Sequence, residues 1–253
     1  MSFSFSFNGV DFSSLGVKVN ASGPEWIPAP KFDIITVPGS DVALANASRY
    51  QARALKFSGV VIGASFADLT AKMDAIALAL NERNDCILSV DAIPGRYWMA
   101  RLGGPIVAEL RRTSAKVDFS FIANDPHAYS TTETDDVQTW PRAAWEITPG
   151  GTHEIAPAVI FEATGAATVV VIENSDTDER ISWAGTLATG NRLKFDCATW
   201  RVWFDQAGLD DWELSQATVS GTFLTLRPGV ANNLRLLAPA AGSLRLIYRE
   251  RYV

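Results

Sequence analysis

The 253-residue chain has few of the side chains that most catalytic and metal sites need: two cysteines and two histidines. Cys86 and Cys197 lie in apolar, strand-like runs in different halves of the chain, which predicts buried free thiols rather than a disulfide or a reactive site. His127 and His153 both lie next to turn signals, without further ligand residues at a metal-binding spacing. We therefore expect surface or loop histidines, no metal site and no cofactor.

The chain has no excess of positive charge. Its formal net charge is −6. Residues 1–129 carry 12 basic and 12 acidic side chains, whereas residues 130–253 carry 10 basic and 16 acidic ones. Because the negative excess lies in the second half, the composition argues against a nucleic-acid-binding surface there.

Long hydrophobic runs are also missing. No stretch of about 18 apolar residues occurs, and no positively charged segment precedes an apolar run near residue 1. We expect a soluble product without membrane insertion or a visible export signal. At 47% hydrophobic and 10% aromatic residues, the chain is nevertheless able to bury a substantial core. Its length suggests one or two domains.

Helical periodicity is confined to one segment, residues 66–81. Ser65 and Asp68 form a capping pair at its start. We expect this helix to cover one face of a sheet or to close the end of a barrel. Apolar side chains recur there at spacings of three and four and are expected in the core: Phe66, Leu69, Met73, Ile76 and Leu80.

The rest of the chain has the alternation typical of strands. Val117, Phe119 and Phe121 alternate with polar residues in a strand that stops at Asp125-Pro126. Before this point we expect strands at 2–7, 12–20, 32–37, 50–63, 86–92 and 96–102. After it, strands at regular spacing without a helical period are expected at 154–163, 168–174, 180–183, 192–195, 199–205, 223–226, 233–237 and 243–252.

These patterns predict a mainly β protein with two domains. Residues 1–130 form a β-rich domain with one helix, and the polar segment 131–151, anchored by Trp140 and Trp145, forms a connector. Residues 152–253 have the strand spacing of a β-sandwich of about a hundred residues.

Three acidic clusters offer little support for an enzyme or a calcium site. Residues 176–179 lack the glycine and the later glutamate of a calcium loop, so we expect a solvated hairpin tip. Residues 135–136 and 210–211 could offer paired carboxylates for acid and base work on a sugar, but adjacent strand or loop positions point apart. Neither a nucleophile elbow nor a phosphate-binding glycine loop occurs, and we predict no catalytic residues.

The segment 200–205 suggests a carbohydrate-binding module as the alternative function. Alternation predicts that three residues face the core: Trp200, Val202 and Phe204. The residues that then face outwards are Arg201, Trp203 and Asp205. An exposed indole beside an arginine and an aspartate could stack on a sugar ring and hydrogen-bond its hydroxyls. The competing interpretation is that the connector or a neighbouring subunit covers Trp203.

Several motifs resemble the distal tail proteins of long-tailed bacteriophages when taken in order. The opening 5–11 is followed by Leu15-Gly16-Val17, and a proline-glycine loop lies at 38–40. The single helix and the strand that ends in Asp-Pro and an aromatic residue at 119–129 follow. The second half adds similar segments at 151–157, 190–197, 223–229, 232–233 and 248–252. Where the family loop commonly continues with a basic residue and a glycine, this chain has Ser40-Asp41-Val42.

The resemblance implies a ring-forming structural protein at the end of the phage tail tube. Such rings typically have six members, join the tube to the tip or baseplate hub and leave a channel for the tape measure protein and the DNA. The first domain would oligomerise, and the second would be a galectin-like sandwich facing outwards. The implied partners are further copies of the chain, the tube protein, the tape measure protein, a hub or fibre protein and, in the alternative, host carbohydrate.

The same resemblance implies a location and a set of interface residues. We expect the protein in the virion, at the distal end of a non-contractile tail, after synthesis in the bacterial host cytoplasm. A ring needs two different complementary surfaces on each protomer, which an edge strand and protruding hairpins can supply. The residues that we expect in the ring interface are Pro38, Gly39, Ser40, Asp41, Arg49 and Arg53.

Overall fold

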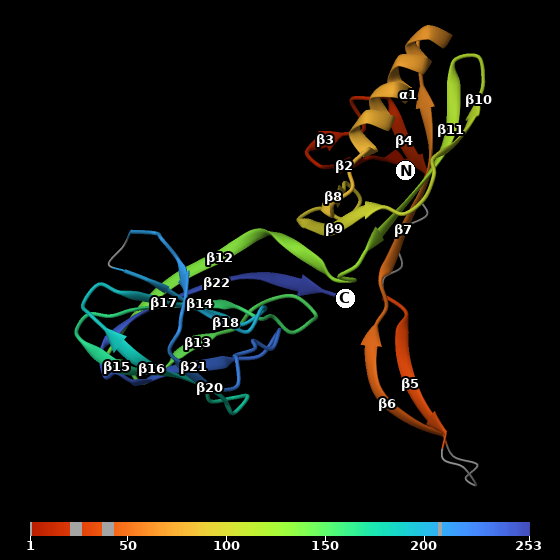
Figure 1. Ribbon diagram of the computed structural model, residues 1–253. Coiled ribbons are helices and arrows are strands. Elements are labelled where there is room, and N and C mark those ends of the chain that lie inside the picture. The colour runs from red at the N-terminus through yellow and green to blue at the C-terminus, as the bar shows by residue number, and fades with distance from the viewer. Residues whose placement is uncertain (1, 21–26, 37–42, 207–208) are drawn as a thin grey trace. The chain divides into compact units, whose positions relative to one another are not determined.

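A computed structural model describes residues 2–20, 27–36, 43–206 and 209–253 of the chain (Figure 1). These residues divide into two compact units, one of residues 1–129 with 253 and one of residues 130–252. Antiparallel strands make up most of both units, which confirms the mainly β fold class. Within the described ranges, no helix is long and apolar enough to cross a membrane.

The described part of the first unit contains one helix, and its strands pair around β7 and β11. β7 pairs with β4 and β11, β11 also pairs with β9 and β10, and β8 pairs with β2 and β9. The elements are β1 (Ser2–Phe3), β2 (Phe5–Phe7), β3 (Val10–Asp11), β4 (Val17–Asn20), β5 (Pro30–Thr36), β6 (Ala43–Tyr50), β7 (Arg53–Ile62), α1 (Phe66–Leu80), β8 (Cys86–Val90), β9 (Arg96–Leu102), β10 (Val107–Leu110) and β11 (Ser114–Ala123).

Phenylalanines dominate the core of this unit. The ring centroids of Phe5 and Phe119 lie 5.2 Å apart in an edge-on contact, and those of Phe5 and Phe57 lie 5.4 Å apart. The alternation expected at 2–7 is confirmed only in β2, where Phe5 and Phe7 are buried on either side of Ser6; Ser4 is itself buried, interrupts the strand and donates its N–H to Asp91. The strand expected at 12–20 begins only at Val17, because the Asp11 carboxylate accepts the Ser13 N–H at 2.8 Å and builds a turn.

The predicted helix is present as α1, and it contacts β7 and β11. Its capping pair is confirmed, since the Ser65 side chain accepts the Asp68 N–H at 3.1 Å. Leu69, Ile76 and Leu80 are buried as expected. The expectation for Phe66 was wrong: at the first helical position its side chain is 57% exposed.

β5 and β6 form a two-stranded sheet of their own (Figure 1). We call this hairpin the arm, defined by β5 and β6. The sequence predicted β5 but missed β6, and the turn expected at Pro38-Gly39-Ser40-Asp41 lies outside the described residues. A two-stranded hairpin is marginally stable alone in water. The arm therefore needs a further surface to pack against.

The second unit is a sandwich of two sheets with strands coloured from green to blue in Figure 1. One has the order β12-β22-β14-β17-β18-β19 and the other β13-β21-β15-β16-β20. The strands are β12 (Ala128–Trp140), β13 (Trp145–Ile147), β14 (Ala158–Glu162), β15 (Ala167–Asn174), β16 (Glu179–Leu187), β17 (Arg192–Asp196), β18 (Arg201–Asp205), β19 (Glu213–Leu214), β20 (Thr218–Gly221), β21 (Asn232–Ala238) and β22 (Gly242–Tyr252).

The core of the second unit confirms the predicted sandwich but corrects two segments. The connector expected at 131–151 forms β12 and β13, and its Trp140 and Trp145 are buried in the core as expected. The strand expected at 223–226 is reduced to an isolated bridge between Ile155 and Leu226. In both segments the structure depends on pairing with residues that lie far away in the sequence.

Candidate functional site

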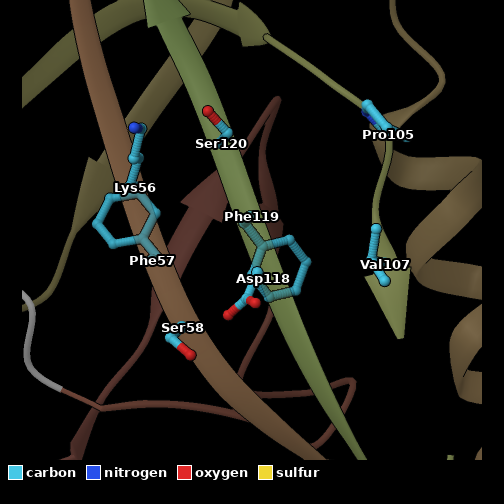
Figure 2. Close-up of a pocket in the computed structure, with 8 residues that line it drawn as sticks. All are labelled: Lys56, Phe57, Ser58, Pro105, Val107, Asp118, Phe119 and Ser120. Carbon is cyan, nitrogen blue, oxygen red and sulfur yellow. The ribbon is translucent and has the colours of Figure 1, made fainter. Parts of the chain in front are cut away.

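A groove of about 390 Å³ lies on the first unit, along β7 and β11 (Figure 2). The register pairs Lys56 with Ser120, and Ser58 with Asp118. Because cross-strand partners share a face, these four polar side chains lie on one side of the sheet, opposite the buried side chains of Phe57 and Phe119. Pro105 and Val107 complete the lining.

The groove has a lining of mixed polar and apolar character. Its lining joins hydroxyl groups and one charge of each sign to an apolar wall, where Val107 is 65% exposed. Val107 lies opposite Asp118 in the pairing of β10 with β11. A strand edge or the side of a hairpin carries the alternating polar and apolar groups that such a surface accommodates.

The predicted ring-interface residues separate into three groups. Residues 38–41 lie outside the described residues. Arg49 is exposed on β6 of the arm. Arg53 is only 4% exposed, donates from Nη1 to the Pro126 carbonyl at 3.2 Å and lies 5.6 Å from the ring centroid of Trp98. Arg53 is thus packed within its own chain, and its contact with a neighbouring copy stays a prediction.

The histidines occupy loops, but His127 is not on the surface. It is 7% exposed, and its Nδ1 lies 2.6 Å from Oδ1 of Asp125. The same carboxylate accepts a hydrogen bond from the Tyr129 hydroxyl. Among the described residues no group of three or more histidine, cysteine or carboxylate side chains could hold a metal ion.

The two thiols are free. Cys197 is buried as predicted, and desolvation raises its pKa to about 12. Cys86 is only half-buried; its pKa is raised by desolvation and by the nearby charges of Glu82 and Asp85.

The three acidic clusters make hydrogen bonds and an ion pair within the second unit. Asp176 accepts hydrogen bonds from the backbone and side-chain N–H groups of Asn233, which explains the hairpin tip at 176–179. Asp135 accepts two hydrogen bonds from Arg245, and these bonds lower the pKa of that carboxyl group. Asp210 pairs with Arg192.

The segment 200–205 has the predicted alternation only from Arg201 onwards. Trp203 faces outwards with Lys194, its partner on β17, and is half-buried. Asp205 lies on the same face but is fully buried, because Arg192 binds its carboxylate and the Asp211 N–H donates to it at 3.1 Å. Trp200, expected in the core, lies in the preceding turn and is 76% exposed.

Sequence reasoning missed two features, one in each unit. Trp212 lies in the segment before β19, and its ring centroid is 5.2 Å from the Arg192 guanidinium. The groove along β7 and β11 was also missed, because β10 has no clear alternation in the sequence. The concentration of tryptophans between positions 200 and 212 was the available signal for the former.

Comparisons with known proteins found one matching family and several similar solved structures. Residues 150–252 match the family described as siphovirus-type tail component, C-terminal domain. The crystal structure of SPP1 Dit (gp 19.1), described as a paradigm of the hub adsorption apparatus in phages that infect Gram-positive bacteria, is 16% identical and matches with a TM-score of 0.78 over 99% of both chains. No curated protein sequence matches the chain.

Two structures of the phage P2 baseplate in its activated conformation are more distant. The form with Ca is 10% identical with a TM-score of 0.47, and the form with Sr is 9% identical with a TM-score of 0.49. Each match covers 98% of this chain and 97% of the other chain. The resemblance to distal tail proteins seen in the sequence is confirmed by the family match and the SPP1 Dit fold. Residues 150–252 thus match the siphovirus-type tail component family, and the chain as a whole has the fold of SPP1 Dit.

Proposed function

We propose that this protein is a structural component of a phage tail that assembles into a ring, six-membered, at the distal end of the tail tube. The ring joins the tube to the tip or baseplate hub and leaves a channel through which the tape measure protein and the DNA pass. The observation that carries the proposal is the fold shared with SPP1 Dit over 99% of both chains, together with the family match at 150–252.

The first unit offers the two unlike surfaces that a closed ring requires. A cyclic assembly uses heterologous contacts, in which one patch of each copy binds a different patch of the next. The arm is a two-stranded sheet that needs a covering surface, and the groove along β7 and β11 is an open surface on the same unit. In the proposed ring, the arm of one copy lies in the groove of its neighbour.

The charges are compatible with this contact. Lys31 and Arg49 are exposed on the arm, while the groove carries Asp118 beside Lys56. Phe32, 54% exposed on the arm, supplies an apolar side chain for the wall at Pro105 and Val107. Because residues 1–129 have equal numbers of basic and acidic side chains, copies of this unit can approach without strong repulsion.

The proposed role is structural and not catalytic, in keeping with the tail-component family. Its partners are further copies of the chain, the tube protein, the tape measure protein and a hub or fibre protein. Synthesis takes place in the bacterial host cytoplasm, and the assembled ring stays in the virion.

Size-exclusion chromatography with light scattering tests the proposal. The expected mass is an integer multiple of the 27.4 kDa protomer, with six copies as the specific expectation. A mass of one protomer that persists at the highest attainable protein concentration contradicts the ring.

A further inference from the structure

The described tryptophans are either buried or gathered in one segment of the second unit. Of the seven tryptophans that the structure describes, four are buried: Trp98, Trp140, Trp145 and Trp183. The other three are Trp200, Trp203 and Trp212, and they lie within 13 residues of one another. Large aromatic side chains left outside a core are more informative than scattered aliphatic ones, since aromatic side chains dominate the energetics of interfaces.

The strand register places Trp203 on the outer face of β17, β18 and β19. Trp203 lies opposite Lys194 on one side and Leu214 on the other. Two residues further along β18, Asp205 lies opposite Arg192. Residues two apart on a strand and their direct partners share one face. The Trp203 side chain therefore lies between those of Lys194 and Leu214.

Trp212 is held in position by a buried charge. The fully buried Asp205 binds the Arg192 guanidinium, which also pairs with the exposed Asp210 and lies against the Trp212 ring. The pair thus orders one indole beside the face that carries Trp203. Side chains held in place before a ligand arrives lower the entropy cost of binding.

Trp200 is the most exposed of the three. It occupies the turn between β17 and β18 with a φ of 55°, a left-handed conformation that is uncommon for a bulky residue. The Asp196 carboxylate accepts the N–H groups of Ala198 and Thr199 at 3.2 and 3.3 Å, which orders the turn. The turn therefore presents a 76% exposed indole from a defined backbone.

We propose that this face binds a polysaccharide chain through Trp200, Trp203 and Trp212, with Lys194 and Arg201 as hydrogen-bond donors. The C–H face of a pyranose ring stacks on an indole, while its hydroxyl groups need polar partners. The structure shows no ion pair to Lys194 or Arg201 among the described residues, so both cations are available to a ligand. Aromatic side chains and arginine are also enriched at protein interfaces, so binding of a tail protein at this face is the competing outcome of the test.

An array of immobilised bacterial surface glycans, neutral and acidic, tests this site with the full-length protein. We expect selective binding by the wild type and a loss of roughly tenfold or more in affinity for Trp200→Ala and for Trp203→Ala, as for the truncation of a central aromatic contact. Leu237→Ala, on β21 of the other sheet and 44% exposed, is the matched control and should bind like the wild type.

Two further measurements make the outcome decisive. Each variant should have the oligomeric mass and the urea midpoint of the wild type, which separates loss of the site from loss of the fold or the ring. Saccharide titration should also shift the tryptophan fluorescence of the wild type, and the shift should shrink in Trp203→Ala. A wild type that binds no glycan on the array, or a folded Trp203→Ala variant that binds at full affinity, overturns the proposal. Binding of a tail protein at this face, without binding of any glycan, also overturns the proposal.

Discussion

Nε of Arg192 lies 2.7 Å from Oδ2 of Asp205, and the Asp205 carboxylate is completely buried while the Arg192 side chain is 20% exposed. Removing one partner of a buried ion pair leaves the other without compensation, which typically costs several kcal/mol. Asp205→Ala should therefore lower the free energy of unfolding by about 3 kcal/mol.

Urea unfolding followed by tryptophan fluorescence measures this cost. Asp210→Ala removes the other carboxylate bound to Arg192, but Asp210 is 79% exposed, so it should cost less than about 1 kcal/mol. Equal losses in the two variants would show that burial of Asp205 does not govern the strength of the pair.

The N-terminus of α1 gives a second prediction. The Ser65 side chain accepts the Asp68 N–H, and Ser65→Ala leaves that donor without its helix cap. We expect a loss of about 1 kcal/mol in the free energy of unfolding. Ser65→Asp preserves an acceptor and serves as the control; a Ser65→Ala variant as stable as the wild type would contradict the capping role.

The buried thiol of Cys197 predicts a pH dependence. Burial raises the pKa of this thiol from its ordinary value of 9.0 to about 12, so the folded protein keeps the proton over a range where the unfolded chain releases it. Ionisation favours the unfolded chain as the pH rises from about 9 towards 12. The free energy of unfolding should therefore fall more steeply over this range in the wild type than in Cys197→Ala.

Thiol titration at pH 8 gives a faster check on the same residue. Since the thiolate is the reactive species, Cys197 should not react until the protein unfolds, whereas the half-buried Cys86 reacts slowly. In Cys86→Ser no thiol should react in the native state. Rapid labelling of the native Cys86→Ser variant would show that Cys197 is accessible.

A charge placed in the groove tests the ring interface. Val107 is 65% exposed in the groove wall, and Val107→Asp should separate the ring into smaller species. Val230→Asp makes the same change at a 50% exposed site of the second unit and should leave the ring intact. A ring that survives Val107→Asp at micromolar concentration would remove the groove from the interface.

The sequence revealed those elements whose hydrophobic pattern has a regular period. Val117, Phe119 and Phe121 alternate with polar residues, and the helix stripe includes Leu69 and Ile76; these features correspond to β11 and α1. When one face of a helix or strand is buried, its apolar residues recur with the period of that element. The element can then be predicted from the local sequence alone.

β12 escaped the same reasoning because its side chains are mostly exposed. It pairs with β22, where Arg245 binds Asp135 and Arg249 binds Glu133. The pairing of β12 therefore involves arginines that lie more than a hundred positions later in the sequence. The acidic run at 133–136 and the basic final strand together were the only sequence signal for this pairing.

The prediction for the segment 200–205 was correct only in part. Alternation correctly placed Arg201 and Trp203 outwards and Val202 inwards. It could not predict that Arg192 and the backbone of Asp211 would cover Asp205, since these contacts depend on a neighbouring strand and a loop. Trp200 was misplaced because the strand begins one residue later, at Arg201.

Negative-stain electron microscopy of the purified protein tests ring assembly directly, because class averages display the number of subunits and the hole of a ring. We expect closed, sixfold particles with an open centre. Single protomers, or open-ended filaments without a closed ring, would contradict it.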